Sequence, residues 1–407
     1  MKKTGLIPRL ILAIVLGIIV GSLSFIPVIG LEFIITAVQL FSTVMNFILP
    51  IMIVAFIVPG IAQISNNTGK LLGLTVLLSF GSLFFAAILS YGFGQAVFPF
   101  FVSEAETSLF DEAAGLTPLF ELPVEPFFTV AEGVVFALII GLALTYLKKQ
   151  GKGETLEQVF VDLQDTISAV LNHFIIPLLP FYVFGNFLNL SFKGDAFQVI
   201  GAFLPVYVLI VVQHFMYLAI MFFLSTRASG NSLKDSFKHA FQAYATAFGT
   251  QSSAATVPVS IRAGKKNGVS DEIADYIFPL YANTHLPGSM ISVSSVVLAV
   301  LIMTGGNTSP GAMIGFFFTI ALVLSAAPGV PGGAIMAALP FLGIVGIGST
   351  GVVASLLITL YLTQDSFGTS INVTADQTLA PIVDKYYQSS QKEVTEKIAK
   401  KQPAKVK

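Results

Sequence analysis

Long apolar stretches separated by short polar segments make up most of this chain. A stretch of about 20 apolar residues is long enough to cross a bilayer as a helix, so the pattern predicts membrane-spanning helices. The stretches cover residues 10–29, 31–64, 71–100, 128–147, 155–192, 196–225, 239–261, 273–304, 309–345 and 349–385. Those at 31–64 and 155–192 exceed the required length, and we expect them to form strongly tilted helices.

The pattern changes after residue 239, where glycine, proline, serine and threonine interrupt the apolar runs. The interruptions read TAFGTQSSAATVP, YANTHLPGS, SAAPGVPGGA and GTSINVTAD. Irregular backbone at membrane depth is tolerated only where protein buries it or where it lines a cavity. Repeated interruptions favour discontinuous helices that meet at a binding site. The alternative is that they are packing glycines and proline kinks of ordinary membrane helices.

Composition supports an integral membrane protein. The chain is 55% hydrophobic and 11% charged, whereas soluble domains carry about 25% charged residues. The net charge of −1 gives no indication of a nucleic-acid partner, and the absence of cysteine excludes disulfides and thiolate metal sites. The sequence contains no evident nucleophile–base pair or metal-ligand cluster. We therefore expect no enzyme activity, and no cofactor apart from a coupling ion.

The distribution of basic residues predicts the orientation in the membrane. With eight spans and two re-entrant hairpins, at 239–261 and 309–345, 20 of the 21 basic residues lie on one side, and only Lys193 lies on the other. The positive-inside rule makes that side cytoplasmic. A multi-pass cell-membrane protein with cytoplasmic N- and C-termini follows, with residues 389–407 as a Lys-rich cytoplasmic tail. Loop 103–126 is acidic and is expected outside.

One face of the last apolar stretch is polar. At 100° per residue, Asp365, Thr369, Asn372 and Asp376 fall within a stripe about 60° wide. No Lys or Arg occurs between residues 267 and 384, so we expect the positive partner of the two carboxylates to arrive from solution. The alternative is a polar helix–helix seam with protonated or paired aspartates.

The interruption GTQSSAATVP is suited to bind a negatively charged group. It places Ser252, Ser253 and Thr256 before a proline, and a hairpin tip of this kind presents free N–H groups at a helix N-terminus. Such a terminus binds a carboxylate. An ammonium group near Asp365 and a carboxylate near the serines describe an α-amino acid.

The same segments resemble the dicarboxylate/amino acid:cation symporters, the glutamate-transporter-like family. The resemblance covers residues 8–386 and rests on DSFGTSINVTAD, QSSAATVP, GVPGGAIM, NFILPIMIVAFIVPG and FALIIGLALTYL. It implies an all-α membrane fold of eight transmembrane helices and two re-entrant hairpins, working as an elevator-type inverted-repeat transporter and assembled as a homotrimer. Residues 1–388 would be the symporter domain. Helices 1, 2, 4 and 5 would form its scaffold; helices 3 and 6, the hairpins, helix 7 (268–304) and helix 8 (349–385) would form its transport core.

The resemblance also implies roles for individual residues. Asp365 and Thr369 would hold the substrate amino group, and Ser252, Ser253 and Asn372 its carboxylate. Val330 belongs to the implied gate, 327–333. The implied cation ligands are Asn283, Asn372 and Asp376, together with main-chain oxygens of helix 7.

Two departures from the family pattern change the expected cargo and ion. Acid-selective members carry an arginine where this chain has Gly368 or Gln251, so an acidic side chain would lack a bidentate partner. The helix-seven motif Asn-Met-Asp-Gly reads HLPG from His285 to Gly288, which removes an aspartate and makes His285 a possible proton carrier.

We therefore predict a symporter that imports a small neutral amino acid together with Na⁺ or H⁺. The alternatives are a dicarboxylate, an acidic amino acid or cystine as cargo, and, from another class of protein, a passive channel.

Overall fold

The computed structural model describes residues 6–64, 69–102, 115–128, 130–325, 327, 332–349 and 351–401, and all regular structure in these ranges is helical. The first half of the chain contains α1 (Leu6–Ser22), α2 (Val28–Ile64), α3 (Gly69–Val97), the 3-10 helix η1 (Phe98–Phe100), α4 (Val130–Lys149), α5 (Glu154–Val170), the π-helical turn η4 (Leu171–Ile175) and α6 (Ile176–Lys193). The second half contains α7 (Ala196–Ser229), α8 (Leu233–Thr250), α9 (Ser253–Lys266), α10 (Asp271–Thr284), α11 (Pro287–Met303), α12 (Pro310–Leu324), α13 (Gly333–Ala338), the 3-10 helix η5 (Leu339–Val345) and α14 (Gly351–Lys401).

The all-α class expected from the sequence is confirmed, and several helices suit a membrane. Within the described residues, five helical stretches are long and apolar enough to cross a bilayer: Val28–Pro59, Gly73–Phe100, Glu154–Lys193, Ala196–Ser229 and Asp271–Met303. Shorter apolar helices cover Pro8–Ser22, Pro310–Leu324 and Gly333–Val345. The chain is therefore a multi-pass membrane protein by its pattern of helices, while the count of eight spans stays a prediction.

The interrupted segments form broken helices. The first is a helical hairpin of α8 and α9 that turns at Gln251, the one described non-glycine residue with a positive φ, 53°. Helix seven is divided between Thr284 and Pro287, where α11 begins with a proline at its first helical position. That position needs no backbone N–H donor, and the fixed φ of proline suits it. The second hairpin comprises α12, α13 and η5.

The last helix is longer than expected. The sequence predicted an end at residue 385, but α14 continues to Lys401, so residues 389–401 of the Lys-rich tail are helical. The segment after Pro381 contains no glycine or proline before Pro403, and its Gln, Lys and Glu residues are good helix formers. Local propensity therefore extends the helix beyond the apolar stretch.

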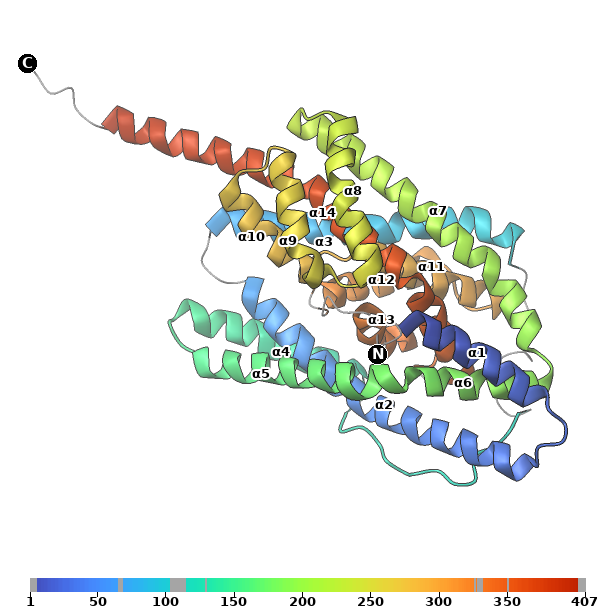
Figure 1. The fold of residues 1–407 in the computed structure, drawn as a ribbon. Helices are drawn as coiled ribbons and strands as arrows, with labels where there is room; N and C mark the ends of the chain where they lie inside the picture. Colours follow the sequence, from blue (N-terminus) through green and yellow to red (C-terminus); the bar gives the residue numbers. More distant parts are fainter. Residues whose placement is uncertain are drawn as a thin grey trace, which may run out of the picture.

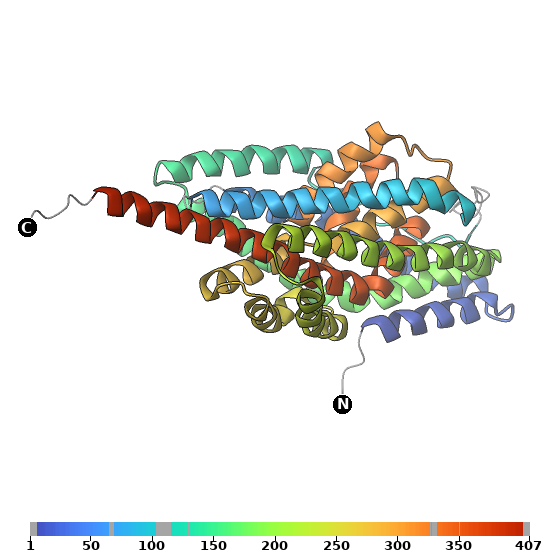
Figure 2. The same ribbon diagram turned by 90° about the horizontal axis from the view of Figure 1, so that it is seen from above.

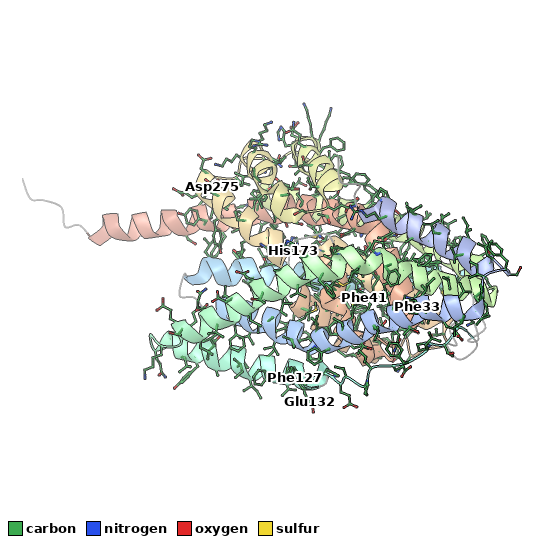
Figure 3. The ribbon with its side chains drawn as sticks, turned by 60° about the horizontal axis from the view of Figure 1, so that its bottom comes forward. Phe33, Phe41, Phe127, Glu132, His173 and Asp275 are labelled. Carbon is green, nitrogen blue, oxygen red and sulfur yellow. The ribbon has the colours of Figure 1, made fainter. Side chains whose placement is uncertain are left out.

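Helix α14 passes through the middle of the molecule and projects beyond it toward the C-terminus (Figures 1 and 2). It packs against α7, α8 and α11, and α11 also packs against α3. In another part of the molecule α1 packs along α6, and α2 along α4. Figure 3 places Phe33 and Phe41 of α2 in this second part and Asp275 of α10 on the opposite side. The broken helices and the polar face of α14 are thus gathered in one region.

Candidate functional site

The polar stripe of α14 faces the protein interior. Asp365, Thr369, Asn372 and Asp376 are each at most 5% exposed, in a helix surrounded by α7, α8 and α11. The helical period therefore placed these four side chains on one buried face, as expected. Because burial of a carboxylate without partners is costly, the partners of each aspartate define what this region can bind.

Asp365 meets the tip of the second hairpin. Its Oδ2 accepts a hydrogen bond of 2.8 Å from the backbone N–H of Gly332, and its Oδ1 accepts one of 3.3 Å from the Thr369 hydroxyl. Gly332 has a φ of 75° at the N-cap of α13, a left-handed conformation that favours glycine. Val330 and most of the expected gate, 327–333, lie outside the described residues.

The first hairpin approaches the same part of α14 with its tip. The Gln251 side-chain amide donates a hydrogen bond of 2.9 Å to Ser366, the residue after Asp365. Ser252 caps α9 and accepts from the Ala255 amide at 3.2 Å, and Ser253 is buried. The two hairpins are therefore attached to α14 at consecutive residues, through Gln251 of the first and Gly332 of the second.

The Asn372 side chain forms hydrogen bonds with the start of α11, the second part of the broken helix seven. Its Oδ1 accepts from the backbone amides of Gly288 at 2.7 Å and Ser289 at 3.2 Å, and its Nδ2 donates to the Ser289 hydroxyl at 3.0 Å. These amides belong to the first turn of α11, whose N–H groups have no partner within the helix. Asn372 thus acts as an N-cap supplied by another helix.

Asp376 has a partner from within the chain. Its Oδ1 lies 2.7 Å from Nδ1 of His285, and Nε2 of that imidazole lies 2.9 Å from the Ser82 hydroxyl. Ser82 in turn shares a hydrogen bond of 2.5 Å with the Tyr217 hydroxyl. The chain therefore supplies Asp376 with a hydrogen-bonding partner, an imidazole from the gap between α10 and α11, while the expectation of a positive partner from solution stays a prediction.

The side chains that contact Asp376 and Asn372 are engaged in hydrogen bonds with other protein groups. Sodium needs free oxygen ligands, but Nδ1 of His285 faces the carboxylate, and the Asn372 oxygen already accepts two amide hydrogens. The Ser82 hydroxyl is engaged by His285 and Tyr217. Asn283, expected to share this site, is exposed in the last turn of α10, and the residue of this segment that reaches Asp376 is His285.

Sequence reasoning missed Ser82, Tyr217 and Ser289. The first two are polar residues in long apolar helices, and nothing in their spacing connects them to residue 376. The other histidines contact no carboxylate: His214 bonds the Gly288 carbonyl, His239 bonds the Asn267 side chain, and His173, labelled in Figure 3, bonds the Ala169 carbonyl one turn earlier.

Comparison with known proteins agrees with this architecture. The model of the sodium:dicarboxylate symporter family matches residues 6–386. The chain belongs to the sodium:dicarboxylate symporter family. This match confirms the resemblance inferred from the helix and hairpin motifs.

The relatives of this family member include proteins named as amino acid transporters. A serine/threonine transporter, SstT, of Acinetobacter baumannii is 24% identical over 409 residues, which cover 94% of this chain and 97% of the relative. The protein of the same name in Lacticaseibacillus casei is 26% identical over 379 residues, covering 90% and 86%. An excitatory amino acid transporter of Caenorhabditis elegans is 25% identical over 259 residues, covering 62% and 50%.

Proposed function

We propose that this member of the sodium:dicarboxylate symporter family is a secondary active symporter that imports a small neutral amino acid with a cation. The observation that carries the proposal is the position of Asp365. Its carboxylate contacts the second hairpin at Gly332, and the neighbouring Ser366 contacts the first hairpin at Gln251. A ligand that binds this carboxylate therefore binds where both broken elements meet.

The proposed substrate contacts follow from the chemistry of an α-amino acid. Asp365 and Thr369 receive the ammonium group. Ser252, Ser253 and the N–H groups of the hairpin tip receive the carboxylate, aided by the second hydrogen of the Asn372 amide nitrogen. Val330 completes the proposed site from the second hairpin.

A neutral side chain is favoured because this region lacks a guanidinium group. The side-chain amide of Gln251 is hydrogen-bonded to Ser366, and Gly368 lies against Gly288 of α11. An acidic side chain would leave a desolvated charge without a partner, which costs several kcal/mol. The names of the serine/threonine transporters among the relatives support this choice over dicarboxylates, acidic amino acids or cystine.

The proposal also covers the coupling ion, the division into scaffold and transport core, and the orientation in the membrane. The coupling ion is Na⁺, with H⁺ as the alternative. We assign α1, α2, α4, α5 and α6 to the scaffold and α3 and α7–α14 to the transport core, which moves as an elevator within a homotrimer. The termini face the cytoplasm.

The deciding experiment is counterflow in proteoliposomes loaded with unlabelled serine. We expect labelled serine, threonine or alanine to accumulate in a saturable way, and aspartate, glutamate, succinate and cystine to compete poorly. Collapsing the Na⁺ gradient with the pH gradient kept, and then the reverse, identifies the ion. Aspartate competing better than every neutral amino acid would overturn the proposed cargo, and non-saturable flux independent of any gradient would indicate a channel.

A further inference from the structure

The polar face of α14 has two ends that differ in their partners. At the Asp365 end, the carboxylate interacts with the Gly332 N–H and with the Thr369 and Tyr361 hydroxyls, which are all neutral groups. At the Asp376 end, the carboxylate meets an imidazole that is 0% exposed. Among the described contacts of these two carboxylates, only that of Asp376 is with a ring nitrogen.

The hydrogen-bond chain fixes which atom faces Asp376. An ionised carboxylate only accepts hydrogen bonds, so beside the ionised form of Asp376 the contact of 2.7 Å requires a hydrogen on Nδ1 of His285. The Ser82 and Tyr217 hydroxyls complete the chain on the far side of the ring, and either direction of their hydrogen bond leaves that hydrogen in place. Nδ1 of His285 therefore occupies the space beside Oδ1 of Asp376, where a cation bound to that oxygen would lie.

The chain also ties together four separate elements. Asp376 comes from α14, His285 from the break in helix seven, Ser82 from α3 and Tyr217 from α7. All four side chains are buried. A ring held at both nitrogens by buried partners cannot swing aside without breaking both contacts, each costly to leave unmade in an apolar interior.

We propose that the imidazole of His285 takes the place beside Asp376 that a transported sodium ion would otherwise occupy, so that any coupling Na⁺ binds elsewhere. This inference rests on the proposed cation-coupled function. It assigns His285 as a residue that lowers the number of sodium ions bound by each chain, and Asp376 as its anchor instead of a sodium ligand.

The test is equilibrium binding of ²²Na⁺ to the purified full-length protein at one fixed pH, with and without serine. We expect Asp376→Asn to bind as many ions per chain as the unmodified protein. His285→Asn replaces the ring with an amide oxygen and is expected to bind one additional ion, which the double variant His285→Asn with Asp376→Asn then loses. His214→Asn, which alters another fully buried histidine, is the matched control and should leave the count unchanged.

Transport provides a second readout. In His285→Asn the Hill coefficient for Na⁺ in serine uptake should rise by about one, since this coefficient is limited by the number of sites. A lower ²²Na⁺ count in Asp376→Asn overturns the inference, as does an unchanged count in His285→Asn. If one variant fails to fold, the other decides, with His285→Gln as a replacement for His285→Asn. Because counting bound ions needs no transport, a failed serine uptake assay would refute the proposed cargo and not this inference.

Discussion

At the scale of single residues, the two aspartates of α14 show how equal side chains on one helical face acquire different chemistry. Asp365 contacts donors that carry no charge, whereas Asp376 contacts an imidazole. Their residue types and helical phase are the same, so the difference comes from the elements that pack opposite each of them. Substitutions at single positions should therefore separate their roles.

Asp365→Asn should abolish serine uptake. The substitution keeps the shape of the side chain but removes the charge that the ammonium group is proposed to bind, and a loss of at least about 100-fold corresponds to about 2.7 kcal/mol. Initial uptake rates in proteoliposomes measure the effect, with Asp162→Asn on the surface of α5 as a control. Uptake at the unmodified rate would exclude Asp365 from the substrate site.

Gly368→Arg should shift preference from serine toward aspartate. A Cβ at this position would come no closer than 3.7 Å to Gly288 and Ser289, so the position admits a Cβ, and a guanidinium group binds carboxylates bidentately. The measurement is the ratio of aspartate to serine competition, and Gly368→Ala separates the effect of bulk from that of charge. An unchanged ratio in the arginine variant would contradict the assignment of Gly368 to side-chain selectivity.

At the scale of elements, each broken helix is hydrogen-bonded to a side chain of α14. Ser366 accepts from Gln251 at the tip of the first hairpin, Asp365 accepts from Gly332 in the second, and Asn372 caps α11. Helix termini leave backbone groups without intrahelical partners, and in a membrane no water is present to satisfy them. The last helix supplies such partners to Gly332 and to the first turn of α11, whereas at the first hairpin it bonds the Gln251 side chain and Ser252 caps α9.

Asn372→Leu should destabilise the protein by roughly 2–3 kcal/mol, because two amides of α11 lose their acceptor. Asn372→Asp keeps an acceptor oxygen and should cost less. Thermal unfolding of the substrate-free protein in detergent compares the two variants, so that substrate binding does not contribute. Equal melting temperatures for both variants would show that the cap contributes nothing to stability.

The left-handed backbone of Gln251, at the tip of the first hairpin, should lower the stability of the protein. With a φ of 53° at Gln251, Gln251→Ala loses the bond to Ser366 and keeps the strained backbone, whereas Gln251→Gly loses the bond and relieves the strain. Left-handed backbone costs a non-glycine residue roughly 1–2 kcal/mol, so the glycine variant should be the more stable of the two in thermal unfolding. The reverse order would indicate that the tip adopts another conformation.

At the scale of the whole molecule, contacts between the proposed scaffold and core should limit transport. The Ser349 hydroxyl, just before α14, donates to the Asn46 side chain of α2 at 3.3 Å, and an elevator motion must break this contact. The chain contains no cysteine, so an introduced pair is the only thiol pair present.

The double variant Asn46→Cys with Ser349→Cys should lose at least about 90% of serine uptake on oxidation, because a disulfide requires its Cβ atoms to stay within about 4.5 Å. Reduction should restore uptake, and each single variant should be insensitive to oxidant. Full uptake by the demonstrably cross-linked protein would contradict sliding of the core against α2.

The sequence by itself determined the helical class, the positions of the breaks and the buried face of α14. These properties depend on local terms: apolar length, the helical period and the chemistry of proline and glycine. It could not predict that His285 meets Asp376, 91 residues away along the chain, or that Ser82 and Tyr217 extend that contact from two further helices. It also missed the capping of α11 by Asn372 and the continuation of α14 to Lys401. Such contacts depend on the relative depth and rotation of packed helices. Apolar patterning along any one of them leaves both undetermined, and only the tertiary packing fixes them.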